Sequence, residues 1–208
     1  MINKNFLQEA SLLQLSEEIF STVINDGRKL NTVENLLTEK IKEAETINFI
    51  LADGLGYENL MSLETSLKDN IKKIINTTFP SSTNVALATF AMMSHPIDHG
   101  IIGYYMYDKN NFGLINALNW NSENELLLNN DHFKNQESIW KKFKSFNTHV
   151  SNFQPENLVG SSLSNFLYEK SSTVPYRTIE NLIEILSEAS FLENRFNFIY
   201  YPNVDIAG

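Results

Sequence analysis

The sequence predicts an α/β fold in which helices flank a mostly parallel sheet. Short apolar runs typical of buried strands occur at residues 47–51, 71–79, 148–153 and 196–202. Segments with apolar residues at helical spacing lie between these runs. Parallel strands need such crossovers, so the alternation favours an α/β protein. The length of 208 residues and the 42% hydrophobic content suffice for one packed domain.

In the N-terminal third, the sequence pattern predicts two helices and a strand. Residues 6–24 carry apolar side chains at helical spacing, which predicts an amphipathic helix that ends near Asp26 and Gly27. A second, short helix is predicted over residues 33–42. The run INFIL, residues 47–51, predicts the first buried strand.

The middle of the chain predicts a helix, a strand, a second helix and a strand pair. The first helix covers residues 58–70, and IKKIINTTF, residues 71–79, predicts the strand. A helix is predicted over residues 84–93, because it is preceded by Pro80 and by the candidate caps Ser81, Ser82 and Thr83. Residues 101–108 and 113–120 then predict two paired strands, and residues 121–135 an irregular polar segment.

The C-terminal third continues the alternation. Residues 137–146 predict a helix, residues 148–153 a strand, residues 178–191 a helix and residues 196–202 the last strand. No internal repeat, flexible linker or low-complexity tract divides the chain, so residues 1–208 are predicted to form a single α/β portion. The sequence stops at VDIAG, where an α/β unit normally continues into a helix.

Composition limits the possible partners. The net charge of -9 argues against nucleic acid polymers and anionic membrane surfaces, but not against a small anionic substrate beside a metal ion. Without cysteine, any metal must have oxygen or imidazole ligands. The sequence shows no secretory signal and no apolar run long enough to cross a bilayer, so we expect a cytoplasmic protein. Its oligomeric state stays open.

Three polar side chains stand where a strand ends or a helix begins. Asp53 follows the strand at 47–51, Thr83 follows the run TTFPSS at a helix start, and Asp205 follows the last strand. Each has a plain alternative, namely a turn, a helix cap or a loop residue. Ligands of open α/β sheets gather at the carboxyl ends of the strands, so we expect the three side chains to converge there.

The order and spacing of these segments resemble a known family. FILADGLGYENL, FPSSTNVALATFAMMSHPIDHGIIGYYMY and YYPNVDIAG resemble motifs of the type I phosphodiesterase and nucleotide pyrophosphatase family, within the alkaline phosphatase superfamily. The resemblance covers residues 47–208 and implies an alkaline-phosphatase-like domain of which this chain is the N-terminal half. Met92 and Met93 replace the Thr-Gly pair of many relatives, and the family's later histidine motifs are missing.

The resemblance also implies a set of site residues. It implies two divalent metal ions, usually zinc, with manganese as an alternative. Asp53 would bind one metal, Thr83 would be the nucleophile and a ligand of that same metal, and Asp205 would bind the other. Asn84 would hold a phosphoryl oxygen. Asp98-His99-Gly100 has the same residues as a metal-binding Asp-His-Gly motif of the family. Its place directly after the nucleophile helix instead matches a segment that is structural in the family, so His99 is expected to bind no metal.

The implied function is a metal-dependent hydrolase of phosphodiester or pyrophosphate bonds. It would act on a small phosphoester or nucleotide through a threonine nucleophile. A phosphomonoesterase or a phosphonate hydrolase on the same fold is an alternative, and a sulfatase is the least favoured. A different class also stays open: an inactive fragment or noncatalytic domain without the full metal set. The 208 residues alone are expected to bind metal weakly and to be inactive.

Overall fold

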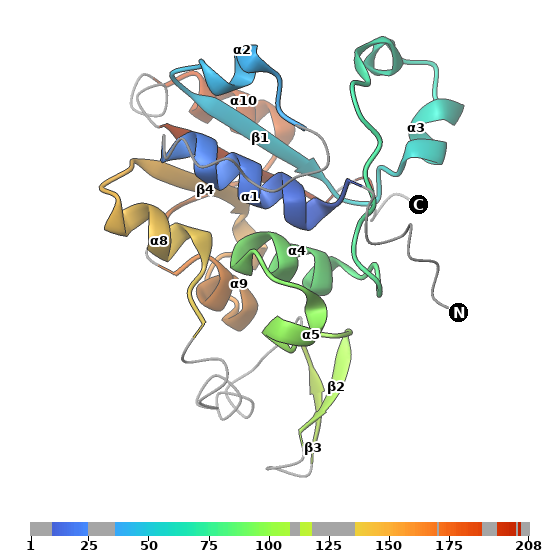
Figure 1. Cartoon of the computed structure of the whole chain (residues 1–208), viewed down its shortest axis with the longest axis vertical. Helices are drawn as coiled ribbons and strands as arrows, with labels where there is room; N and C mark the ends of the chain where they lie inside the picture. Colours follow the sequence, from blue (N-terminus) through green and yellow to red (C-terminus); the bar gives the residue numbers. More distant parts are fainter. Residues whose placement is uncertain are drawn as a thin grey trace.

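A four-stranded parallel sheet forms the centre of the molecule (Figure 1). The computed structural model describes residues 10–24, 36–108, 113–117, 136–169, 171–188, 195–202 and 204. The strand order is β1-β6-β4-β5, and every neighbouring pair is parallel. The strands are β1 (Ile47–Ala52), β4 (Val150–Pro155), β5 (Ser172–Tyr176) and β6 (Phe196–Tyr201). The predicted α/β fold with a mostly parallel sheet is therefore confirmed.

Helices cover both faces of this sheet. They are α1 (Leu12–Val23), α4 (Thr83–Met92), α8 (Ile139–Ser145), α9 (Ser162–Leu167) and α10 (Ile179–Leu186). The larger apolar cluster joins α1, α4, α8 and α9 to one face, and a smaller cluster joins α10 to the other. Strand β6 takes part in both clusters, because successive side chains of a strand point to opposite faces. Phe196, Phe198 and Tyr200 enter the larger cluster, and Ile199 enters the smaller one.

The larger cluster is built around α4. This helix is apolar around most of its circumference, which is typical of a helix buried on all sides. Phe90 of α4 is fully buried, and its ring centroid lies 5.1 Å from that of Phe49 on β1 and 5.3 Å from that of Phe198 on β6. These contacts fix α4 against the two strands whose carboxyl ends carry the candidate site.

Several small elements complete the described fold. They are α2 (Glu39–Lys42), α3 (Tyr57–Ser62), η2 (Ser66–Asn70), α5 (Pro96–His99), η4 (Glu156–Leu158) and the strands β2 (Tyr105–Asp108) and β3 (Gly113–Asn116). The last two pair as an antiparallel hairpin, as predicted, at the bottom of Figure 1. Of the helices that the structure describes, none has the length and apolarity needed to cross a bilayer.

The strand predicted over residues 71–79 is wrong. This segment forms only one isolated bridge, between Asn76 and Ser11. Its apolar side chains do not share a buried face, since Ile74 is 60% and Phe79 88% exposed. An apolar run becomes a strand only where a neighbouring strand accepts its hydrogen bonds, and β1 pairs with β6 instead. Thr83 therefore does not follow a strand, contrary to expectation.

The helix predicted over residues 58–70 is divided into α3 and η2. Thr65 stands at the break, and its hydroxyl accepts a hydrogen bond from the Leu67 backbone N–H. Such local side-chain bonds compete with helix hydrogen bonds and start a new turn. The helix predicted over residues 33–42 is also shorter. Among the described residues of this range, only α2 is helical.

Strand β5 and helix α9 were not predicted. Strand β5 contains Pro175, and proline is accepted mainly on edge strands, which is the place of β5 in the sheet. Other predictions lie outside the described residues. They concern the helix end at Asp26 and Gly27 and the irregular segment at residues 121–135.

Candidate functional site

Asp53 lies at the carboxyl end of β1. Its backbone N–H donates to the Tyr201 carbonyl at 2.9 Å and so continues the parallel ladder by one residue. Gly54 then turns the chain at φ 80°, a left-handed conformation that glycine adopts without strain. The Asp-Gly pair is thus a real turn, and the turn leaves the half-buried Asp53 carboxylate at the edge of the sheet.

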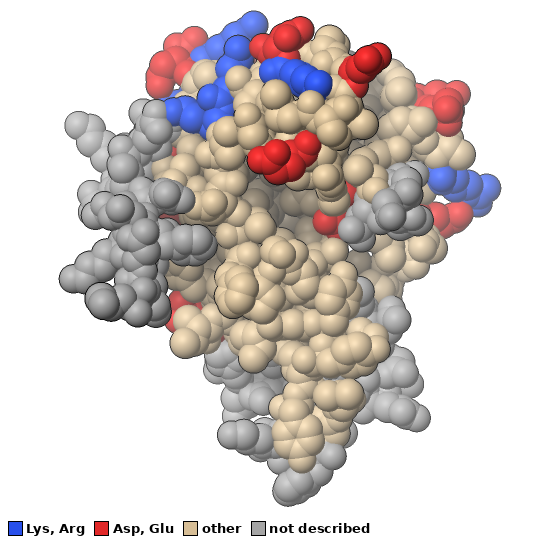
Figure 2. Space-filling view, turned by 90° about the vertical axis from the view of Figure 1, so that its right-hand side faces the viewer, with Lys and Arg blue, Asp and Glu red and all other residues tan. Residues whose placement is uncertain are grey.

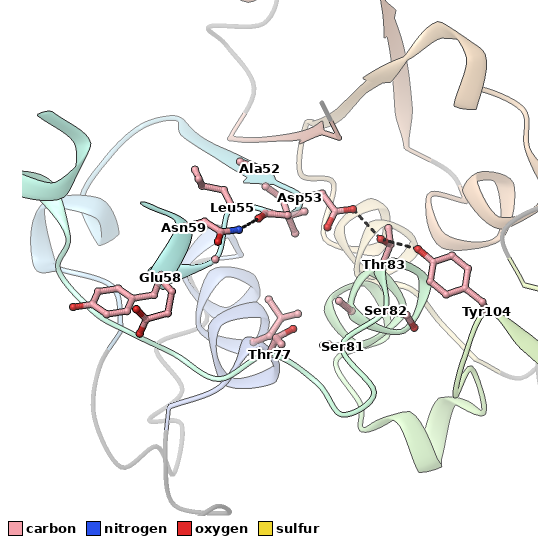
Figure 3. Close-up of a pocket in the computed structure, with 16 residues that line it drawn as sticks. Ala52, Asp53, Leu55, Glu58, Asn59, Thr77, Ser81, Ser82, Thr83 and Tyr104 are labelled. Atoms are coloured by element: carbon pink, nitrogen blue, oxygen red, sulfur yellow. Dashed lines mark hydrogen bonds between the residues drawn. The ribbon is translucent and has the colours of Figure 1, made fainter. Parts of the chain in front are cut away.

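Thr83 is the first residue of α4 and meets Asp53. Its Oγ1 donates a hydrogen bond to Asp53 Oδ2 at 2.9 Å (Figure 3). Ser82 is the N-cap residue, but its side chain makes no capping hydrogen bond. The N-terminus of α4 therefore presents backbone N–H groups and the positive end of the helix dipole beside the Thr83 hydroxyl.

Two tyrosines extend this contact into a chain of hydrogen bonds. Tyr104 donates to Thr83 Oγ1 at 3.3 Å, and Tyr200 donates to Asp53 Oδ2 at 2.8 Å. Burial raises the pKa of Tyr200, and the hydrogen bond to the Asp53 carboxylate raises it further. Tyr200 therefore stays protonated and acts as a donor to Asp53. Figure 3 shows Asp53, Thr83 and Tyr104 in line along one wall of a pocket.

Of the other two predicted site residues, the structure describes Asn84. Asn84 is fully buried, and its Nδ2 donates to the Gly103 carbonyl at 2.7 Å. Its Oδ1 has no hydrogen-bond partner among the described residues. Asp205 lies outside the described residues, so its place beside Asp53 and Thr83 stays a prediction.

His99 lies in the core. It is 1% exposed, its Nε2 contacts Thr89 Oγ1 at 2.9 Å, and its Nδ1 accepts from the Ile101 N–H at 3.1 Å. Because Nδ1 accepts, Nε2 carries the proton and donates to Thr89. Both ring nitrogens are engaged within the protein, as expected of a structural histidine.

Asp53, Thr83 and Tyr104 line a pocket of about 710 Å³. Its wall is formed by residues 51–59 and 81–83 together with Leu12, Thr77, Ala86 and Tyr104. Among the described lining residues, Asp53 and Glu58 are charged and none is Lys or Arg. In Figure 2, the Lys and Arg side chains drawn in blue lie in the upper part and at the right edge, away from the central hollow. The described part of the pocket thus offers an anionic group the N-terminus of α4 but no cationic side chain.

A divalent cation fits part of this wall. The Asp53 carboxylate and the Thr83 hydroxyl lie 2.9 Å apart, and both are oxygen ligands of the kind that zinc and manganese accept. Among the described residues, both hydrogen-bond donors to the Asp53 carboxylate bind Oδ2. Oδ1 is therefore open to a cation. The described part of the chain holds no cluster of three or more His, Cys, Asp or Glu side chains. Asp53 and Thr83 thus fit as two ligands of one ion, and a full ligand set needs further groups.

Tyr104 and Tyr200 are the site residues that sequence reasoning missed. Tyr200 could have been found from the period of the last strand, since it shares a face with Phe196 and Phe198 and pairs with Leu51, two residues before Asp53. Tyr104 had no comparable signal. It lies 21 residues after Thr83 in a segment without regular alternation, and only the folded chain brings the two hydroxyls together.

The fold and the site together define a class: an α/β protein with a carboxylate and a helix-start hydroxyl at the carboxyl edge of a parallel sheet. Comparison by sequence specifies this class further. The sequence matches the model of the type I phosphodiesterase / nucleotide pyrophosphatase family over residues 49–208, and the chain belongs to this family. No curated protein matches the sequence. The family indicates a hydrolase of phosphodiester or pyrophosphate bonds, and the predicted resemblance is confirmed.

Proposed function

We propose that this chain carries the nucleophile of a metal-dependent phosphodiesterase or nucleotide pyrophosphatase, and that the nucleophile is Thr83. The observation that carries the proposal is the 2.9 Å hydrogen bond from Thr83 Oγ1 to Asp53 Oδ2 at the wall of the pocket. A threonine hydroxyl is a weak nucleophile unless a neighbouring group takes or replaces its proton. Asp53 stands where that proton points.

Asp53 and Thr83 are the described residues that would hold a metal ion. A divalent ion bound there would lower the pKa of the Thr83 hydroxyl and offset the negative charge of the phosphoryl group. Zinc is our first choice and manganese the second, with a second ion at Asp205. The described pocket lining contains no Lys or Arg, which supports this proposal, because the substrate's charge needs another partner.

The proposed reaction has two displacements. Thr83 Oγ attacks phosphorus, the P–O bond to the leaving group breaks, and the phosphoryl or nucleotidyl group stays on Thr83. Water then attacks phosphorus, the bond to Thr83 Oγ breaks, and the hydroxyl is restored. Backbone N–H groups at the start of α4 lie beside the attacking oxygen and favour the charge of the transferring group.

The substrate is proposed to be a small phosphoester or a nucleotide. A monoester or a phosphonate on the same site stays the alternative. The expected inactivity of the 208 residues alone and the cytoplasmic location stay predictions.

The test compares two threonines that begin helices. Thr83 begins α4, and Thr178 precedes α10 as a plain cap whose hydroxyl accepts from the Asn181 N–H. In the full-length protein, Thr83→Ala should lower phosphodiester turnover by roughly a thousandfold or more, because the covalent step is lost. Thr178→Ala should keep turnover and lose about 1 kcal/mol of unfolding free energy.

Hydrolysis of bis-nitrophenyl phosphate, nitrophenyl thymidine phosphate and nitrophenyl phosphate, each with zinc and with manganese, measures turnover and substrate class. Denaturant unfolding checks that both variants fold. A folded Thr83→Ala protein with activity within about tenfold of wild type would reject Thr83 as the nucleophile.

A further inference from the structure

We propose that Tyr104 is a second catalytic residue of this site. In the resting protein its hydroxyl donates to Thr83 Oγ1, and during transfer it donates to a non-bridging oxygen of the phosphoryl group. The inference rests on the proposed function, since it needs Thr83 as the attacking group.

The direction of the hydrogen bonds places the Tyr104 proton at the reacting atom. Thr83 uses its own proton on Asp53 Oδ2, so the contact of 3.3 Å between the Tyr104 hydroxyl and Thr83 Oγ1 has Tyr104 as donor. Thr83 Oγ1 is the atom that becomes bonded to phosphorus. In the proposed role, the same donor turns to a non-bridging oxygen of the phosphoryl group once that group is bonded to this atom.

The backbone on both sides of the Tyr104 ring is held in place. Asn84 Nδ2 donates to the Gly103 carbonyl at 2.7 Å, and the Ala117 N–H donates to the Tyr104 carbonyl at 2.7 Å. Asn84 and Ala117 are both fully buried. The Tyr104 side chain is 38% exposed at the pocket wall, so its anchor is rigid and its hydroxyl is accessible to substrate. Preorganised donors of this kind contribute most to stabilising charge that develops in a transition state.

The same geometry assigns a different role to Asn84. Its amide holds Gly103, the residue before Tyr104, and Asn84 directly follows the nucleophile on α4. One turn of α4 therefore fixes both the attacking oxygen and the donor opposite it. Asn84 acts on the substrate through Tyr104, as a positioning residue.

The chemistry of the pocket explains why an uncharged donor matters. None of the described lining residues is Lys or Arg, so this part of the wall offers the phosphoryl oxygens no cationic side chain. A phenol hydroxyl supplies a hydrogen bond without a charge. It can strengthen as charge builds up on the oxygen, which favours the transition state over the bound substrate.

The test is Tyr104→Phe in the full-length protein, with Tyr105→Phe as the matched control. Tyr105 is the next residue, lies 63% exposed on β2 and does not line the pocket. For bis-nitrophenyl phosphate, Tyr104→Phe should lower kcat at least about tenfold and leave KM within about threefold. Inhibition by vanadate, which imitates the five-coordinate phosphorus, should weaken by a similar factor. Tyr105→Phe should match wild type in all three values.

An Asn84→Ala variant separates positioning from direct binding. It should lower kcat in the wild-type background and cause little further loss in the Tyr104→Phe background, because coupled residues are not additive. A full second loss in the double variant would show that Asn84 contacts the substrate itself. Should Asn84→Ala not fold, Asn84→Ser takes its place.

The result that overturns the inference is a folded Tyr104→Phe protein with kcat and vanadate affinity within about twofold of wild type. An equal loss in Tyr105→Phe would overturn it as well. An active Thr83→Ala protein would instead overturn the proposed function. A dead Thr83→Ala protein beside a fully active Tyr104→Phe protein would reject the role of Tyr104 alone.

Discussion

At the scale of single residues, the site depends on one carboxylate oxygen. Asp53 Oδ2 accepts hydrogen bonds from Thr83 and from the buried Tyr200, so the orientation of the carboxylate is set from two sides. Hydrogen bonds to an ionised group are roughly twice as strong as neutral ones. The Asp53 carboxylate therefore already has a fixed orientation at the pocket wall before any ligand binds.

A surface pair offers a measurable test of charge effects at this scale. Arg177 donates to the Glu156 carboxylate from Nε at 2.8 Å and from Nη2 at 3.0 Å. These hydrogen bonds, followed by the charge of Arg177, hold the pKa of Glu156 below its ordinary value of 4.5. The stabilisation by this pair is present above about pH 4.5 and is lost as pH falls through the lowered pKa.

Arg177→Ala should therefore raise the pKa of Glu156 towards 4.5, as measured by an NMR titration of the side-chain carboxyl group. Glu180 is the internal control. The pKa of Glu180 is also lowered, but by hydrogen bonds from its own backbone and from Thr178. The pKa of Glu180 should therefore not change in Arg177→Ala. An unchanged Glu156 pKa in this variant would show that the ion pair is absent in solution.

At the scale of elements, α4 links the core to the site. At its start, Thr83 meets the pocket and Asn84 meets the Tyr104 segment. Most of the later residues of the helix are buried in the larger apolar cluster. Contacts with β1 and β6 hold this helix in place. The position of Thr83 therefore depends on core packing several residues away.

Two phenylalanines near α4 test this dependence. Phe90 is fully buried, and Phe79 is 88% exposed. Phe90→Ala should lower the free energy of unfolding by about 3–5 kcal/mol, because it removes a large side chain and leaves a cavity. Phe79→Ala should change it by no more than about 0.5 kcal/mol. Denaturant unfolding measures both, and similar losses in the two variants would contradict the described position of α4.

At the scale of the whole molecule, β6 contributes side chains to both apolar clusters and so connects them. It pairs with β1 on one side and with β4 on the other, and its side chains enter both clusters. The β2–β3 hairpin has the opposite character. It pairs only within itself in the described sheet order, and Tyr105, Tyr107 and Leu114 are all at least 60% exposed.

Hydrogen exchange should therefore follow this difference. Backbone amides of β6 should exchange slowest, at rates that approach those of global unfolding, since opening β6 disrupts both clusters. Amides of the β2–β3 hairpin should exchange much faster through local opening. Mass spectrometry of exchanged peptides checks the order, and a hairpin as protected as β6 would mean that another surface covers it.

Local patterns in the sequence were enough to predict strands β1, β4 and β6, the helices α1, α4, α8 and α10, and Asp53 and Thr83 as candidate residues. Strand alternation, helical spacing, caps and the Asp-Gly turn each depend on residues close together in the chain. The family resemblance rests on the same local motifs, and the match over residues 49–208 confirms it.

Long-range packing decided the rest. No local pattern showed that residues 71–79 lack a strand partner, that Pro175 sits on an edge strand, or that β6 lies between β1 and β4. The contact of Thr83 with Asp53 spans 30 residues, and that of Tyr200 with Asp53 spans 147. Such contacts form because α4 and β6 pack against β1. They depend on which surfaces are buried together, and no short stretch of sequence contains that information.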